Sequence, residues 1–109
     1  MNKFLLASLG LAAVACVAMG DDKVYKLKLA SSWESTMPVL GDVPKELKDK
    51  VEKMSNGRLE LRIDYPSKHK SPFAMLDFAK SGQYDITYTS SYYYKGKDAK
   101  TIFFTATPF

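Results

Sequence analysis

The sequence predicts an α/β domain with elements in the order β-α-β-α-β and a mostly parallel sheet. Apolar and polar residues alternate over residues 24–29, 59–65 and 84–89, which is the pattern of half-buried strands. Between these segments apolar residues recur every three or four positions, as on one face of a helix. Strands that alternate with helices through short connections favour parallel pairing with right-handed crossovers.

The first helix is expected to follow the strand at residues 24–29, because apolar residues then take helical spacing: Leu40, Val43, Leu47, Val51 and Met54. Pro44 fits the first turn if the helix begins near Asp42, and otherwise it kinks the helix. Asn56 and Gly57 are expected to end the helix, because both residue types tolerate the left-handed conformation of a C-cap.

The rest of the chain predicts a second helix and further strands. Pro66 should end the second strand and be followed by a polar, basic loop at residues 67–70. A second helix is then expected to start at residues 71–72 (SP) and to end at residues 81–82 (SG), with Phe73, Leu76 and Ala79 on one face. Residues 101–106 are expected to form a fourth short strand.

Aromatic and hydroxyl side chains follow two of the predicted strands. Residues 31–33 (SSW) come after the first strand, and residues 90–94 (SSYYY) come after the third. Ligands of open α/β sheets bind at the carboxyl ends of the strands, so these two segments can form one pocket. Trp33, Tyr92 and Tyr93 are the predicted ligand contacts, with Ser32 behind them; their rings and hydroxyls suit a small carboxylate.

Simpler interpretations stand beside this one. Trp33 can also be a structural plug, and any of the tyrosines at residues 92–94 can pack between sheet and helix. Three consecutive tyrosines cannot all point inward, so at least one should be exposed or face a pocket.

Catalytic signals are poor. His69, the single histidine, lies between two lysines and is expected to be a solvated loop residue. Glycine-rich phosphate loops, histidine metal motifs and nucleophile elbows are missing from the sequence, and its aspartates lack the spacing of a metal loop. Asp85 is expected to be a structural partner of a backbone group or a lysine. These features argue against an enzyme.

The amino terminus predicts export. Lys3 precedes an apolar run of about 16 residues, short of the roughly 20 that a spanning helix needs, and small residues close the run. We expect residues 1–20 to be a signal peptide cleaved before Asp21; a retained anchor is the less favoured alternative. Residues 13–16 (AVAC) also resemble a lipoprotein box with Cys16 as the acylated residue, which we favour less because Ala13 stands where leucine is usual.

The remaining residues 21–109 are enough for one small domain. They carry 15 basic and 12 acidic side chains, a formal charge of +3, and their lysines are spread along the chain. A nucleic-acid-binding protein would more often gather basic residues on one face, so we expect no nucleic-acid partner.

Several segments together resemble the extracytoplasmic solute receptors of tripartite ATP-independent periplasmic (TRAP) transporters, the DctP-like family. They are residues 29–33 (LASSW), residues 54–59 (MSNGRL), Gly82 with Asp85, and residues 91–98 (SYYYKGKD) leading to residues 107–109 (TPF). The tyrosine pair with the GKD sequence is similar to the branch that takes 2-oxo and 2-hydroxy monocarboxylates. Tyr94 stands where that branch usually has tryptophan, and Pro44 departs from its uninterrupted helix.

The resemblance implies a periplasmic-binding-protein-like fold, with residues 21–109 as an incomplete N-terminal lobe. It further implies a non-enzymatic receptor that delivers a small organic acid to TRAP membrane permease subunits by closing two lobes around it. A metal ion accompanies the substrate in some members, but the family's metal ligands and its carboxylate-anchoring arginine lie later in the sequence, so none is expected here. The alternative is a small secreted interaction module with an aromatic and lysine-rich patch.

Overall fold

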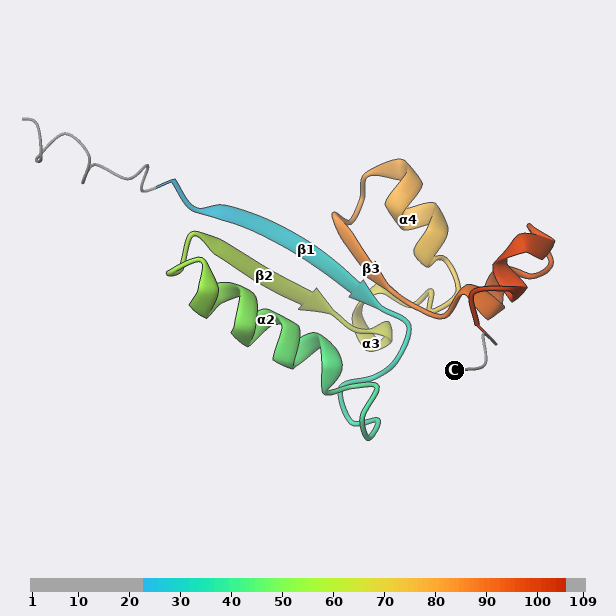
Figure 1. Cartoon of the computed structure of the whole chain (residues 1–109), viewed down its shortest axis with the longest axis horizontal. Coiled ribbons are helices and arrows are strands. Elements are labelled where there is room, and N and C mark those ends of the chain that lie inside the picture. Colours follow the sequence, from blue (N-terminus) through green and yellow to red (C-terminus); the bar gives the residue numbers. More distant parts are fainter. Residues whose placement is uncertain (1–22, 106–109) are drawn as a thin grey trace, which may run out of the picture.

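The fold is built on a parallel sheet of three strands. The computed structural model describes residues 23–105. β1 (Tyr25–Ser31) lies between β2 (Leu59–Asp64) and β3 (Ile86–Tyr88), and both neighbours run parallel to it (Figure 1). Leu29 is opposite Ile63 on one side and Ile86 on the other. The predicted α/β class and parallel pairing are therefore confirmed.

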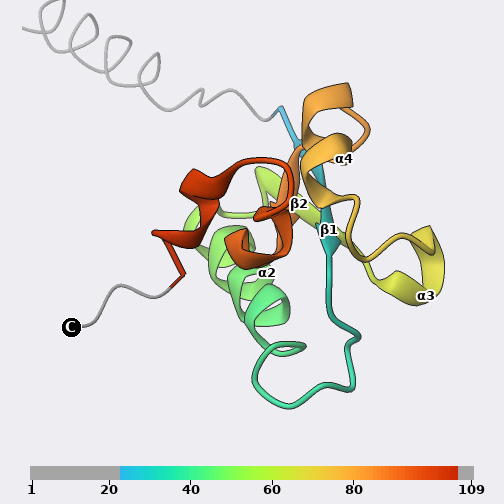
Figure 2. The same cartoon turned by 90° about the vertical axis from the view of Figure 1, so that its right-hand side faces the viewer.

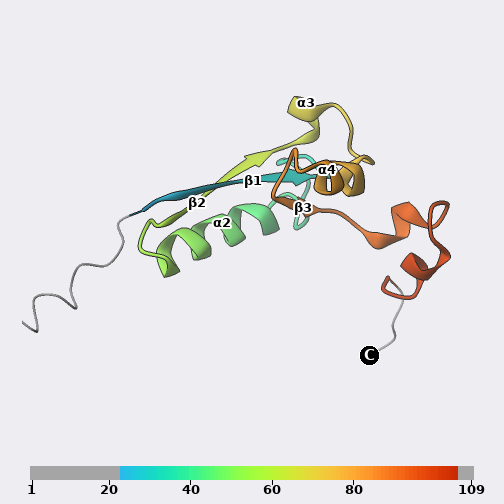
Figure 3. The same ribbon diagram turned by 90° about the horizontal axis from the view of Figure 1, so that it is seen from above.

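Helix α2 (Val43–Met54) packs along β2 on one side of the sheet, and the short helix α3 (Pro66–His69) lies on the other side (Figure 3). Pro44 is buried in the first turn of α2, where its missing N–H costs no helical hydrogen bond. Asn56 and Gly57 both adopt the left-handed conformation, with φ of 51° and 76°. The expected start and end of this helix are confirmed, and the alternative of a kink at Pro44 is wrong.

The connection after β2 differs from the prediction. The expected loop holds a short helix, α3 (Pro66–His69), which begins at proline and ends before Lys70 in the left-handed conformation, with φ of 61°. The next helix, α4 (Met75–Ser81), begins later than predicted, because residues 71–74 form a turn closed by a hydrogen bond from Ala74 N to Ser71 O. Gly82 ends this helix as expected.

The predicted apolar face of the second helix was only partly right, because Leu76 is the one residue of its three that packs against the buried cluster. Phe73 precedes α4 and is 64% exposed, and Ala79 is also exposed. Met75 is instead fully buried in a cluster with Ala30, Tyr84 and Tyr94, against which Leu76 and Phe78 pack. The short helix is rotated so that the residues after the turn face the sheet.

The fourth strand was also predicted wrongly. Two 3-10 turns, η1 (Ser91–Tyr94) and η2 (Ala99–Ile102), follow β3, and they face the viewer in Figure 2. The Asp98 carboxylate accepts a hydrogen bond from Lys100 N at 2.9 Å, and the Thr101 hydroxyl donates to Asp98 O at 2.7 Å. Such local bonds compete with strand pairing. Residue 106 lies outside the described residues.

Residues 23–105 contain no helix that is long and apolar enough to cross a membrane. The predicted signal peptide at residues 1–20 lies outside the described residues, as does the lipoprotein alternative at Cys16.

Candidate ligand-binding site at the carboxyl ends of β1 and β3

The structure brings the two predicted aromatic segments together. Ser32 N donates to Tyr88 O at 2.9 Å, which aligns the end of β1 with the end of β3. The Trp33 ring then lies 4.9 Å from the Tyr88 ring, edge to face, and 6.1 Å from the Tyr93 ring. Two segments 57 residues apart in the chain thus meet at one edge of the sheet, as the carboxyl ends of parallel strands allow.

The rings continue outward from Trp33 as an aromatic cluster. Tyr93 contacts Phe73 edge to face at 5.1 Å, and the Tyr92 ring lies 6.3 Å from Tyr93. Phe73, Tyr92 and Tyr93 are exposed, whereas Trp33 is half-buried. The cluster therefore has an anchored inner end and a solvent-facing outer end, and its open rings offer apolar surface to a small molecule.

Ser32 lies behind the rings. Its hydroxyl donates to Pro72 O at 2.7 Å and lies 2.8 Å from the Thr89 hydroxyl. Thr89 in turn lies 3.5 Å from the Tyr94 hydroxyl, which accepts a hydrogen bond from Leu76 N. Because its hydroxyl is already hydrogen-bonded within the protein, Ser32 holds the segment behind the rings in place. Tyr94 is the buried member of the tyrosine triplet.

Lys95 brings a positive charge to the outer end of the cluster. Its ammonium group donates to the Tyr92 hydroxyl at 3.0 Å and lies 4.5 Å from the centre of the Tyr92 ring. This hydrogen bond and the lysine charge lower the pKa of the Tyr92 phenol. Lys95 was not among the predicted ligand contacts; its position three residues after Tyr92 within a turn is the sequence signal that points to it.

His69 is not a solvated loop residue, so that prediction was wrong. The imidazole is half-buried, with Nε2 2.9 Å from Ser31 O and Nδ1 accepting a hydrogen bond from Ser71 N at 3.1 Å. The Phe78 ring lies 5.5 Å away, edge to face. Because the segment after Pro66 is helical, it turns His69 toward the end of β1.

A buried carboxylate lies at the end of β2. Asp64 is held by Lys68 at 2.9 Å, by the Tyr84 hydroxyl at 3.1 Å and by Arg62 at 3.2 Å. Burial alone would raise its pKa, but the hydrogen bonds from Lys68 and Tyr84 and the nearby positive charges outweigh burial, and the pKa is lowered. These contacts make Asp64 a structural anion.

Asp85 is a structural partner, as predicted. Its carboxylate accepts a hydrogen bond from Lys28 N at 2.8 Å, and its own N–H donates to Lys28 O at 3.0 Å. Within residues 23–105, no three His, Cys, Asp or Glu side chains are grouped so that they could hold a metal ion.

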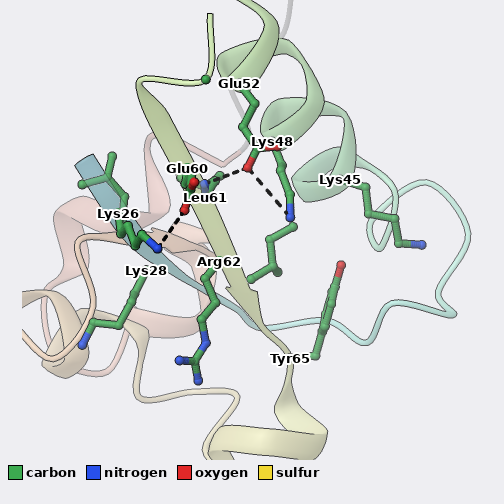
Figure 4. A pocket seen from close by; sticks show the side chains of 12 residues that line it. Lys26, Lys28, Lys45, Lys48, Glu52, Glu60, Leu61, Arg62 and Tyr65 are labelled. Carbon is green, nitrogen blue, oxygen red and sulfur yellow. Dashed lines mark hydrogen bonds and ion pairs between the residues drawn. The ribbon is translucent and has the colours of Figure 1, made fainter. Parts of the chain in front are cut away.

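A separate hollow of about 990 Å³ lies around β2 (Figure 4). Four of its charged side chains pair with one another: Lys26 with Glu60 at 3.3 Å and Lys48 with Glu52 at 3.9 Å. Lys45 and Arg62 pair with Asp42 and Asp64 outside the hollow. Glu52 also accepts a hydrogen bond from Leu61 N at 3.0 Å. We place the candidate site at the aromatic cluster, because the charged side chains of this hollow are already engaged in ion pairs, hydrogen bonds or ring contacts within the protein.

A parallel sheet with aromatic side chains gathered at the carboxyl ends of adjacent strands is the arrangement in which open α/β sheets bind ligands. Residues 29–109 match the family model DctP, described as bacterial extracellular solute-binding protein, family 7. The chain therefore belongs to the DctP family, the solute-binding proteins of TRAP transporters. Members of this family are periplasmic receptors and not enzymes.

Two solved structures resemble the chain. One is a TRAP periplasmic solute-binding protein from Colwellia psychrerythraea with bound calcium and pyruvate, at 49% identity. The other is a TRAP periplasmic solute-binding protein from Pseudoalteromonas atlantica with bound sodium and pyruvate, at 48% identity. Both give a TM-score of 0.75 over 80% of this chain, which spans 26% of theirs. No curated protein matches the chain.

Proposed function

We propose that the chain supplies the N-terminal part of a TRAP-type receptor for a small 2-oxo or 2-hydroxy carboxylate, with pyruvate the best-supported ligand. Trp33, Tyr92 and Tyr93 contact the acid in this proposal, and Ser32 holds the segment behind them. The observation that carries it is the meeting of the half-buried Trp33 ring and the exposed Tyr93 ring from two different strand ends, 6.1 Å apart.

The chemistry of the aromatic cluster supports this ligand class. Exposed rings grip the apolar part of a small acid, and phenol hydroxyls donate hydrogen bonds to its oxygens. Lys95 adds the positive charge that draws an anion toward the outer end of the cluster. The pyruvate in both similar structures supports the same choice of acid.

The partners follow from the family. The receptor delivers its acid to TRAP membrane permease subunits, and residues 1–20 act as the signal peptide that sends it to the periplasm. Capture by closing two lobes requires contacts that are stronger in the closed state. The rings at the strand ends supply the contacts of one lobe.

The test uses the single tryptophan as its own reporter, because Trp33 lies in the proposed site. Titration of the chain with pyruvate should change the fluorescence emission of Trp33 and raise the unfolding temperature, since a ligand that prefers the folded state stabilises it. Removing the ring in Tyr93→Ala should weaken pyruvate binding about tenfold, a loss of about 1.4 kcal/mol. Tyr93→Phe separates the ring from the hydroxyl.

Tyr25→Phe is the matched control, because Tyr25 is an exposed aromatic residue at the opposite end of β1. It should bind pyruvate as the unmodified chain does. Equal affinity in Tyr93→Ala, or Trp33 emission unchanged by pyruvate, would contradict the proposed site.

A further inference from the structure

His69 completes the hydrogen bonding at the end of β1. β2 ends at Asp64, which is opposite Ala30, so Ser31 lies one residue beyond the last β1–β2 pair. The Ser31 carbonyl meets the His69 Nε2 atom there, at 2.9 Å. Because a carbonyl oxygen can only accept, Nε2 must carry a proton for this hydrogen bond.

The second ring nitrogen has the opposite role. Ser71 N donates to His69 Nδ1 at 3.1 Å, and a backbone N–H can only donate. Nδ1 must therefore be unprotonated, and these two contacts together select the neutral imidazole with its proton on Nε2. The Phe78 and Tyr84 rings, 5.5 and 6.3 Å away, pack edge to face against the imidazole.

The two hydrogen bonds of the His69 ring are linked to Ser32 by two routes. One goes directly to Ser31, the neighbour of Ser32 in the chain. The other goes through Ser71 to Pro72, whose carbonyl accepts the Ser32 hydroxyl at 2.7 Å. These three hydrogen bonds, together with the chain from Ser31 to Ser32 and from Ser71 to Pro72, form a closed ring. The ring of hydrogen bonds fixes the backbone immediately before Trp33.

We propose that His69 is a positioning residue for the Ser32–Trp33 part of the ligand site, and that it acts only in its neutral form. A second proton on Nδ1 would face the Ser71 N–H, so two donors would meet and the ring of hydrogen bonds would open. The effect on ligand binding rests on the proposed function, whereas the link from His69 to Trp33 does not.

The titratable neighbours of His69 come from α3 and the residue after it, from the segment ahead of β3, and from β2. Lys68 and Lys70 flank it in the chain, Tyr84 packs against its ring ahead of β3, and Asp64 ends β2. Lys68 and Tyr84 both donate to Asp64, so the carboxylate is already compensated. The hydrogen bonds of the His69 ring therefore go to backbone groups, Ser31 O and Ser71 N.

The tautomer can be measured directly, because His69 is the single histidine of the chain. Nitrogen-15 NMR of the imidazole at about pH 8 should show a protonated Nε2 and an unprotonated Nδ1. A proton on Nδ1, or rapid averaging between the two tautomers, would overturn the proposal without any mutation.

The link to the site is tested by Trp33 emission between about pH 8 and about pH 5, the range in which histidines change charge. Acid should change the emission in the unmodified chain and in the control Lys70→Gln, which keeps His69. His69→Gln retains a donor for Ser31 O but cannot be charged, so its emission should not respond to acid. An equal response in His69→Gln would overturn the proposal.

Titration with pyruvate distinguishes a failure of this proposal from a failure of the proposed function. If acid changes Trp33 emission through His69 while pyruvate leaves the emission unchanged at about pH 8, the ligand assignment fails and the link stands. If pyruvate binds equally well at both pH values in the unmodified chain, the positioning role for ligand binding fails and the proposed function stands.

Discussion

Single side chains complete the strand hydrogen bonds in this small sheet. Asp85 binds both backbone groups of Lys28 before β3 begins, and His69 meets the Ser31 carbonyl after β2 has ended. Glu52 takes the Leu61 N–H on the outer side of β2. Such contacts satisfy polar backbone groups that would be costly to bury without a partner.

Asp64→Asn tests the buried carboxylate. Its side chain is 6% exposed and accepts three polar contacts, so the change should lower the free energy of unfolding by about 1–3 kcal/mol at about pH 7. The pKa of Asp64 is lowered in the folded state, so its contribution is complete above about pH 4, the usual value of an unfolded aspartate.

That contribution disappears as the pH falls through the lowered folded pKa. Urea unfolding of both proteins at about pH 7 and at successively lower pH should therefore show two stabilities that converge in acid. A difference that stays constant across this range would contradict the assignment. The exposed pair Lys50–Glu46 offers a control, since Glu46→Gln should change stability by less than about 0.5 kcal/mol.

At the scale of elements, periodic patterns predicted the three strands and α2, whereas the segments without such a period were predicted wrongly. β1, β2 and α2 followed from repeated alternation and from capping residues. The region of α3 was not predicted as a helix, because its proline and three polar residues carry no apolar period and because Pro66 also fits the end of a strand. In η2, the contacts of Asp98 override the apolar run that suggested a strand.

The loop between β1 and α2 depends on Gly41. A Cβ atom at this position would lie 2.5 Å from Glu34 O and 2.8 Å from both Ser35 O and Met37 O. Gly41→Ala should therefore lower the free energy of unfolding by about 1–3 kcal/mol, because backbone atoms must move. Gly96→Ala is the control, since nothing lies within 4 Å of its Cβ position. Thermal unfolding that ranks the two variants equally would contradict this packing.

At the scale of the whole molecule, the position of the candidate site could be predicted from the sequence, because it depends on the strand topology alone. Parallel strands bring Trp33 and the tyrosine triplet to one edge, and the sequence carried both the strands and the aromatic residues. Which tyrosine turns inward depends on the 3-10 turn, and the role of His69 depends on α3. Neither has a periodic signature, so tertiary contacts alone reveal them.

The described residues bury few side chains completely and expose many apolar ones. Met75 is fully buried, whereas Phe104 is 81% exposed. Met75→Ala should lower the free energy of unfolding by about 2–5 kcal/mol, because it leaves a cavity in the core. Phe104→Ser should change this free energy by less than about 0.5 kcal/mol but reduce self-association, because it removes exposed apolar surface.

Urea unfolding and light scattering over a concentration series measure the two effects separately. A Phe104→Ser protein that unfolds more easily, or that associates as strongly as the parent, would contradict the exposed position of this ring.

Side chains occupy part of the outer edge of β2, so this edge is less accessible to another strand. The Leu59 and Leu61 N–H groups, which point away from β1, already donate to Ser55 Oγ and to Glu52, each at 3.0 Å. An incoming strand would have to displace both partners, a form of protection that natural edge strands use against unwanted pairing. We therefore expect an added strand to pair more readily at β3, the other edge of the described sheet and the strand that leads into the tyrosine-rich end of the site.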